Sequence, residues 1–387
     1  MASSSRASFS GLAGPSVNLR SLGLKHASLT KTVWLRILLE RELQKKTFEL
    51  KRDKHGSYVF IVSPGFSRDT VPWAPFPSDD YRSFSLWSLE NKKMACPSFS
   101  LPAGGLLTCA TCPGADAGQT VTPVAQRQAR LEAQSDGWHT PNNAPGTGEK
   151  PLMREGLTIC SQCYATGGNF AYANIQTAEV IRYWWLRQNL AAGRMDWLVQ
   201  IFVDGIRCLP FKPDRHGIRP IRLHDSGDFF SEDYAEMWCR IADELATSMP
   251  NVIIWAPTRT WAAGNWPAFW ERRLPTLKSL ASGRPNLVVR PSGYNFGDWA
   301  PGPLHPTNAK GSTSLYDINA RVPDFLKSRV DPAAVPLPGP AEPRSDFNCQ
   351  VYGAEEPSCL ASRAPDGKVG CRACWVHPEL SINYSSH

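Results

Sequence analysis

The sequence lacks the features that mark membrane-spanning and secreted proteins. No stretch approaches the roughly 18 uninterrupted apolar residues of a transmembrane helix, so we expect no membrane span. Acidic residues are missing before Glu40, and residues 1–30 have neither the compact apolar core nor the cleavage site of a secretory signal. We interpret residues 1–30 as a disordered basic leader, with an organelle transit peptide as the alternative.

An excess of charge is also missing. The 42 basic and 35 acidic residues leave a net charge of +7, which permits contact with nucleic acid without requiring it. Hydrophobic residues make up 42% and charged residues 20% of the chain, as in globular proteins. The 33 prolines predict long ordered loops, and the 14 tryptophans predict large aromatic packing or stacking surfaces.

Eight of the 11 cysteines fall into two sets of four. The first set is Cys109, Cys112, Cys160 and Cys163, and the second is Cys349, Cys359, Cys371 and Cys374. These sets contain three Cys-x-x-Cys pairs, and such a turn lets two thiolates converge on one ion. Disulfides are the alternative, but they suit small secreted chains. We predict an iron–sulfur cluster or Zn²⁺ as the cofactor, in a reducing compartment such as the cytoplasm.

Composition divides the rest of the chain into three regions. Residues 31–93 form an N-terminal extension with a helix and a strand, and residues 94–295 form a β/α core. Residues 118–156 are a polar insertion in that core, between the two halves of the first cysteine set. Residues 296–387 contain a proline-rich segment followed by the C-terminal cysteine site.

Hydrophobic periodicity predicts alternating strands and helices in the core. Helices are expected at 32–50, 174–189, 196–209, 231–249 and 267–280, and strands at 57–64, 218–230, 251–258 and 286–290. Strands separated by helices of this length pair in parallel through right-handed crossovers. The predicted fold class is therefore α/β, with a partial or full β/α-barrel-like core, cysteine-rich metal-binding turns and a long loop-rich C-terminal region. A doubly wound sheet is the alternative.

Polar side chains follow three of the predicted strands. In β/α folds, ligands bind at the carboxyl ends of the strands, so these side chains are candidates for a functional site. We predict catalytic roles for His224, Asp225, Asp228 and Arg259, and cofactor-binding roles for Ser226, Gly227, Arg290 and Ser292.

Each of these predictions has a structural alternative. The turn at 224–228 can instead cap the following helix, with Asp228 and Ser231 accepting from its first amides and His224 packed in the core. Two neighbouring carboxylates repel each other unless a positive group lies nearby. We expect Arg259 to be that group, and a surface salt bridge is its alternative role.

Several short motifs carry a resemblance to a known family. They are SFSLPAG at 98–104, TCPGA at 111–115, CYATGGNF at 163–170, HDSGDFFS within 221–231, and CRACW at 371–375. In this order they resemble the gene product eighty-eight family of phage- and plasmid-borne proteins. That family brings no well-established activity with it.

The cysteine–tyrosine–alanine turn also looks like that of phage proteins related to radical S-adenosylmethionine (SAM) enzymes. This likeness implies a [4Fe–4S] cluster held by Cys112, Cys160 and Cys163 on a partial β/α barrel, with one iron open to SAM. Radical enzymes use the compact spacing C-x3-C-x2-C, whereas 47 residues separate Cys112 from Cys160 here. Cys109 adds a fourth thiolate, which suits a closed zinc site equally well.

Three functions are compatible with these observations. The first is an iron–sulfur protein of phage or plasmid type, radical-SAM-like in its most specific form, acting on an unknown small molecule or nucleic acid. The second is a zinc-stabilised nucleic-acid-binding protein without catalysis. The third is a metal-dependent hydrolase or nuclease whose HDSGD carboxylates bind a divalent ion. The oligomeric state is left open.

Overall fold

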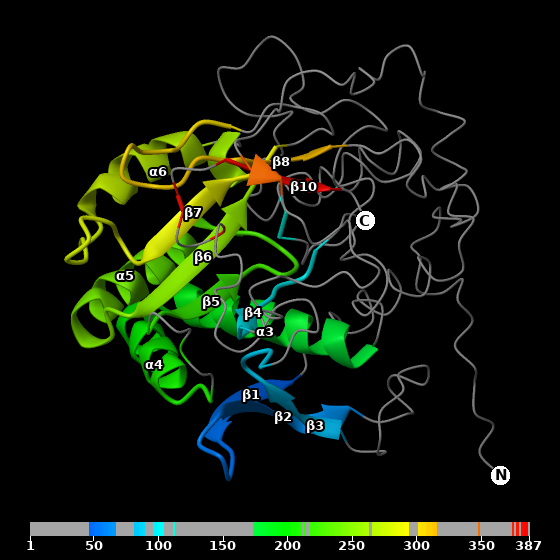
Figure 1. Cartoon of the computed structure of the whole chain (residues 1–387). Coiled ribbons are helices and arrows are strands. Elements are labelled where there is room, and N and C mark those ends of the chain that lie inside the picture. Colours follow the sequence, from blue (N-terminus) through cyan, green and yellow to red (C-terminus); the bar gives the residue numbers. More distant parts are fainter. Residues whose placement is uncertain are drawn as a thin grey trace, which may run out of the picture.

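The computed structural model describes somewhat less than half of the chain (Figure 1). The described residues are 46–66, 81–89, 96–103, 111–112, 173–210, 213, 217–262, 265–293, 301–315, 347–348, 374, 377–378 and 381–385. The leader 1–30 and the insertion 118–156 lie outside them. Outside them too lie Cys109, Cys160, Cys163, Cys349, Cys359 and Cys371.

A parallel sheet forms the centre of the molecule. Its four strands are β4 (Ser98–Phe99), β5 (Arg219–Leu223), β6 (Val252–Thr258) and β7 (Leu287–Pro291). They lie side by side in chain order, β4-β5-β6-β7, and all pair in parallel. This confirms the predicted α/β class. Among the described strands the sheet is open, with no pairing between β4 and β7, so barrel closure is not seen there.

Helices connect the strands, as the hydrophobic periodicity predicted. They are α3 (Ala173–Ala191) and α4 (Met195–Arg207) between β4 and β5, α5 (Glu232–Ser248) between β5 and β6, and α6 (Trp266–Arg273) between β6 and β7. Two 3-10 turns, η6 (Thr260–Ala262) and η7 (Leu274–Thr276), flank α6. The predicted cap of α5 is confirmed, since the Ser231 hydroxyl accepts from Tyr234 N at 3.2 Å.

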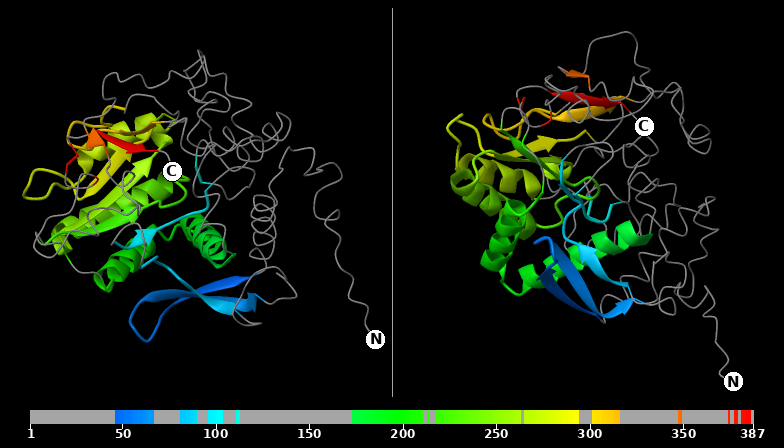
Figure 2. Two further views of the ribbon diagram at one scale, coloured as in Figure 1. Left: turned by 45° about the vertical axis from the view of Figure 1, so that its right-hand side comes forward. Right: turned by 60° about the horizontal axis from the view of Figure 1, so that its bottom comes forward.

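The two faces of the sheet are packed differently. Side chains alternate along a strand, so Ile254 and Val289 join the main core with the helices, and Figure 2 shows the helices gathered on that side. The opposite face carries Ile253, Trp255 and Val288, which form a separate small cluster with Cys96 and Ala309, and Cys374 packs against it. We call this second surface the opposite face.

In the described part of the N-terminal extension, residues 46–66 and 81–89, the chain forms a sheet, where the sequence predicted a helix followed by a strand. Strands β1 (Thr47–Arg52), β2 (Tyr58–Phe66) and β3 (Tyr81–Ser85) pair in antiparallel fashion. The helix predicted for 32–50 is wrong over Thr47–Leu50, where burial alternates with period two, as in a half-buried strand. Phe60 of β2 packs edge-on against Trp185 of α3, with ring centroids 5.1 Å apart. The strand predicted at 57–64 is confirmed.

The described C-terminal residues add a third sheet. Strand β10 (Ile382–Ser385) lies between β8 (Ser312–Leu315) and β9 (Phe347–Asn348), all in parallel. A bridge between Ser292 and Ser312 joins this sheet to the end of β7, and Figure 1 shows β8 and β10 beside that end.

In the part of the chain that the structure describes, no helix has the length and apolar character needed to cross a bilayer.

Candidate functional site

The chain leaves β5 through a strained residue. His224 has a φ of 62°, and no other residue in the described ranges, glycines apart, has a positive φ. This left-handed conformation costs a non-glycine residue on the order of 1–2 kcal/mol. The amide of His224 still donates to Phe99 O of β4 at 2.7 Å, so the turn starts directly at the carboxyl edge of the sheet. Such strain at a strand end is typical of functional sites.

The imidazole of His224 is buried among aromatic rings. Its Nε2 lies 3.2 Å from the Tyr234 hydroxyl, and its ring stands edge-on to Phe229 at 4.6 Å. Burial, with a smaller contribution from the nearby Arg222, lowers the pKa of His224 to about 3. The ring is therefore neutral near pH 7. Among the described residues Nδ1 has no hydrogen-bond partner.

Asp228 ties the end of β5 to the end of β6. Its Oδ1 accepts from Phe229 N at 2.8 Å and from the Thr258 hydroxyl at 2.6 Å, and its Oδ2 accepts from Arg259 N at 2.8 Å. Burial raises the pKa of Asp228 to about 6, although these three donors favour the ionised form. The predicted helix-capping role is thus filled by Ser231, while Asp228 holds two strand ends together.

A chain of hydrogen bonds, with every donor oriented towards Asp228, links this carboxylate to Trp270. Trp270 Nε1 donates to the Thr260 hydroxyl at 3.0 Å, and the Thr260 and Thr258 hydroxyls lie 2.8 Å apart. Because an indole N–H only donates and a carboxylate only accepts, Thr260 donates to Thr258 and Thr258 donates to Asp228. The α6 helix is thereby connected to the turn at 224–228, which we call the polar turn.

Arg222 is the positive partner of Asp225. Its Nε lies 3.1 Å from Asp225 Oδ1, and its guanidinium lies 4.9 Å from the ring centroid of Trp255 on the opposite face. Arg259, which the sequence suggested as the shared positive group, contributes its backbone amide to Asp228, and its Nε donates to Gly293 O at 3.2 Å. Each carboxylate of the turn therefore has its own set of partners.

Ser226 and Gly227 pack the turn against the residues after β4. Gly227 has a φ of 80°, and a Cβ there would lie 2.5 Å from Thr111 Oγ1 and 2.7 Å from Leu101 O. The Ser226 hydroxyl lies 2.9 Å from Leu101 O and makes a short hydrogen bond to Glu179. Ser226 and Gly227 were predicted to bind a cofactor. The contacts described here are with other residues of the protein.

Sequence reasoning missed three residues beside this turn. Glu179 and Arg182 of α3 are buried, and Arg182 donates to Ser100 O at 3.3 Å and to Ser85 O at 3.0 Å. Burial lowers the pKa of Arg182 to about 10, despite the nearby Glu179 and Asp225. The available signal was a carboxylate and a guanidinium three residues apart in a helix that is otherwise largely apolar. The third residue, Thr111, lies inside the first cysteine motif.

One cysteine of each predicted set is described: Cys112 lies beside the turn after β5, and Cys374 packs on the opposite face of the sheet. Cys112 directly follows Thr111, whose hydroxyl accepts from Asp228 N at 2.8 Å and donates to Pro102 O at 2.9 Å. The carbonyl of Cys374 accepts from Arg290 of β7 at 3.3 Å. Within the described ranges, no three His, Cys, Asp or Glu side chains gather closely enough to hold a metal ion.

The remaining predicted residues join the core to the C-terminal segment. Arg290 is fully buried and donates to Lys310 O at 2.7 Å as well as to Cys374 O. The hydroxyls of Ser292 and Ser312 lie 3.1 Å apart. Arg290 and Ser292 thus connect β7 to residues 310–312 and to Cys374.

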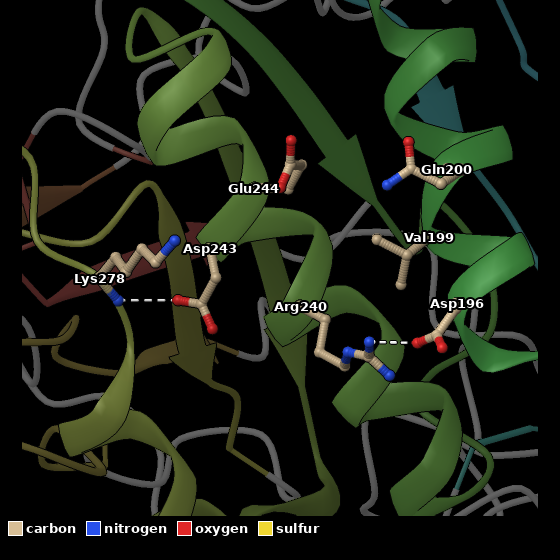
Figure 3. A pocket seen from close by; sticks show the side chains of 7 residues that line it. All are labelled: Asp196, Val199, Gln200, Arg240, Asp243, Glu244 and Lys278. Carbon is tan, nitrogen blue, oxygen red and sulfur yellow. Dashed lines mark hydrogen bonds and ion pairs between the residues drawn. The ribbon is translucent and has the colours of Figure 1, made fainter.

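A polar pocket of about 300 Å³ is lined by residues of α4 and α5 and by Lys278 (Figure 3). Its lining residues are Asp196, Val199, Gln200, Arg240, Asp243, Glu244 and Lys278. Arg240 pairs with Asp196, and the backbone amide of Lys278 donates to Asp243 at 2.8 Å, as the dashed lines in Figure 3 mark. The pocket is therefore separate from the polar turn, and several of its charges already have partners.

Comparison with known proteins gave one match. Residues 79–295 match the family model described as gene product 88. The matched range includes the whole polar turn, α3 and the first cysteine set, and it ends after β7. No curated protein and no solved structure matched the chain, and the likeness to radical-SAM-related proteins received no support. Because the matched residues make up more than half of the chain, the protein belongs to the gene product 88 family.

Proposed function

We propose that the protein is a cysteine-ligated metalloprotein, with an iron–sulfur cluster or Zn²⁺ at the carboxyl edge of the parallel sheet. The observation that carries the proposal is the contact of Thr111 with Asp228, since it places Cys112 next to the polar turn. The first cysteine set lies wholly within the family match, which makes it the better candidate for the functional centre.

The chemistry of the available donors favours thiolate ligation over a carboxylate site. Thiolates are soft ligands that select zinc or iron–sulfur clusters, whereas divalent ions such as Mg²⁺ require several oxygen ligands. Asp225 is paired with Arg222, and both oxygens of Asp228 accept hydrogen bonds from the protein. A hydrolase or nuclease using these two carboxylates for a divalent ion would share them with those partners, so we rank it lower.

The protein's own residues have definable tasks around such a centre. Asp228 and Gly227 hold Thr111, and through it the start of the cysteine turn, against the strand ends. His224 offers a neutral nitrogen, and Arg222 carries a positive charge against the buried ring of Trp255 on the opposite face. A bound cluster would supply electron transfer, and reductive cleavage of SAM is the most specific form of the proposal.

The first test is anaerobic purification followed by absorption spectroscopy and analysis for iron, sulfide and zinc. Iron with matching sulfide is the expected result, and the release of 5′-deoxyadenosine from SAM under reducing conditions would then test the more specific form. Zinc without iron would favour the zinc-stabilised alternative, for which a steep fall of DNA affinity with salt is the next measurement. A chain with neither metal would refute the proposal.

A pair of cysteine variants locates the metal. Cys112→Ser should lower the metal content because serine does not replace a thiolate ligand. Cys208→Ser is the matched control, since Cys208 follows α4, belongs to neither set and lies 3.0 Å from Arg52 Nη1. Equal metal loss in both variants would indicate general destabilisation instead of ligation by Cys112.

A further inference from the structure

Strand β1 forms one edge of the N-terminal sheet. The strand order is β1-β2-β3, and among the described strands nothing pairs with the outer edge of β1. A row of apolar side chains crosses this sheet, since Leu50 lies opposite Phe60 and Phe60 lies opposite Phe84. Phe60 and Phe84 are buried, whereas Leu50 is only partly buried. The apolar row therefore ends with incomplete cover at the edge strand.

The hairpin after β1 shows which backbone groups point outward from this edge. Asp53 N donates to Ser57 O at 2.9 Å, so these two residues form a hydrogen-bonded pair. In an antiparallel ladder, hydrogen-bonded pairs alternate with pairs that are not hydrogen-bonded. In the register of β1 with β2, alternate residues of β1 therefore direct their N–H and C=O groups away from β2. These residues are Phe48, Leu50 and Arg52.

The outward groups allow two copies of β1 to pair around a two-fold axis. In antiparallel pairing, each hydrogen-bonded pair must join two residues of the outward set. With the axis at Leu50, this residue lies opposite Leu50 of a second copy, and Phe48 lies opposite Arg52 of that copy. All three outward residues then find a partner, and the apolar row continues from one copy into the other.

The charges on β1 favour the same register. Glu49 and Lys51 lie on the other face of the strand, with side chains 64% and 54% exposed, and they contact each other at 2.9 Å. With the axis at Leu50, Glu49 of each copy lies opposite Lys51 of the other. The neighbouring two-fold registers place Glu49 opposite Glu49, or Lys51 opposite Lys51. Opposite charges at facing positions stabilise a strand pair, and like charges destabilise it.

We propose that the outer edge of β1 is an interface at which two copies of this chain pair in antiparallel fashion, centred on Leu50. A lysine on an edge strand usually opposes such pairing. Here the glutamate two residues away makes the strand complementary to itself. Pairing of so short a strand buries less than the roughly 1,000 Å² of a stable interface, so the dimer should be weak and reversible. The proposal is independent of the metal content of the protein.

The test measures self-association of the full-length protein by sedimentation velocity between about 1 and 100 μM. The variants are Glu49→Lys and Lys51→Glu, and both substitute exposed side chains, so the fold should be retained. Each substitution places like charges opposite each other in the dimer, and we expect self-association to weaken about tenfold or more. Lys54→Glu is the matched control, since Lys54 is exposed and follows β1.

Mixing the two variants in equal amounts gives the decisive result. One variant carries lysine at both positions and the other carries glutamate at both, so a mixed pair has opposite charges at every facing position. We expect the mixture to dimerise at least as well as wild type while each variant alone stays monomeric. A monomeric wild type, unchanged association in either variant, or a mixture that stays monomeric would overturn the proposal.

Hydrogen–deuterium exchange locates the interface by a different property. The amides of Leu50 and Arg52 should exchange more slowly as the protein concentration rises, because they become bonded to the second copy. The amides of Glu49 and Lys51 already point towards β2, so their exchange should stay nearly constant. Exchange at Leu50 and Arg52 that is independent of concentration would contradict pairing through this edge.

Discussion

The buried carboxyl of Asp228 should make the protein less stable as the pH rises from 4 to 7. Its pKa is raised by burial from 3.8 to about 6 in the folded state. Between these two values the folded protein binds more protons at this position than the unfolded chain, so the free energy of unfolding falls with increasing pH. One pKa unit corresponds to about 1.4 kcal/mol, so the loss amounts to about 3 kcal/mol at this site.

The variant Asp228→Asn isolates this effect because an amide of the same shape does not ionise. The amide nitrogen of the variant replaces one of the two carboxylate oxygens. Depending on its orientation, the acceptor for Arg259 N is lost, or the acceptor shared by Phe229 N and the Thr258 hydroxyl. Leaving a buried donor unpaired costs about 1–3 kcal/mol at every pH. The difference in unfolding free energy, wild type minus variant, should therefore start from an offset and fall by about 3 kcal/mol between pH 3.5 and 7.

Urea unfolding followed by tryptophan fluorescence at half-unit steps of pH measures this difference. Thr258→Val serves as the companion variant, because the Thr258 hydroxyl lowers the pKa of Asp228 by donating to it. Removing that hydroxyl should raise the pKa further and extend the decline to higher pH. A wild-type-minus-Asn difference that stays constant across the range would refute the raised pKa and, with it, the assignment of Asp228 as a buried strand-end carboxylate.

Two further variants test the geometry of the polar turn. Gly227→Ala places a Cβ 2.5 Å from Thr111 Oγ1 on a backbone with φ of 80°, so we expect a loss of about 3 kcal/mol or more, and a loss under 1 kcal/mol would contradict the close packing. Ser231→Ala removes the acceptor for Tyr234 N and should cost about 1 kcal/mol in urea unfolding, whereas Ser231→Asp should retain the stability. Equal stabilities of the Ala and Asp variants would contradict the capping role.

The regular elements after residue 170 were predictable because their signals are local. The unbroken apolar run at 252–257 indicated a buried strand, and Ser231 followed by Glu232 and Asp233 indicated the start of α5. The N-terminal extension was not predictable in the same way. The sequence TFELKR suits a helix or a strand, and pairing of β1 with β2 decides for the strand.

The contacts of the polar turn could not be predicted from its neighbourhood in the chain. Thr111 lies 117 residues before Asp228, and Glu179 lies 47 residues before Ser226. Sequence spacing suggested Arg259 as the positive group for both carboxylates. The charge of Arg259 does favour the ionised form of Asp228, whereas Asp225 pairs with Arg222. Side chains along a strand alternate between the two faces of the sheet. Only the register of the strands therefore decides which side chain reaches which carboxylate.

The sequence by itself determined the residue types at the strand ends, the α/β alternation, the capped start of α5 and the membership of the gene product 88 family. Each of these depends on short-range patterns or on the order of motifs. The tertiary structure alone decided that Asp228 connects two strand ends, that Glu179 and Arg182 lie beside the turn, and that Arg290 holds Cys374. These contacts join residues far apart in the chain, and they form only when the parallel sheet brings its carboxyl ends to one edge.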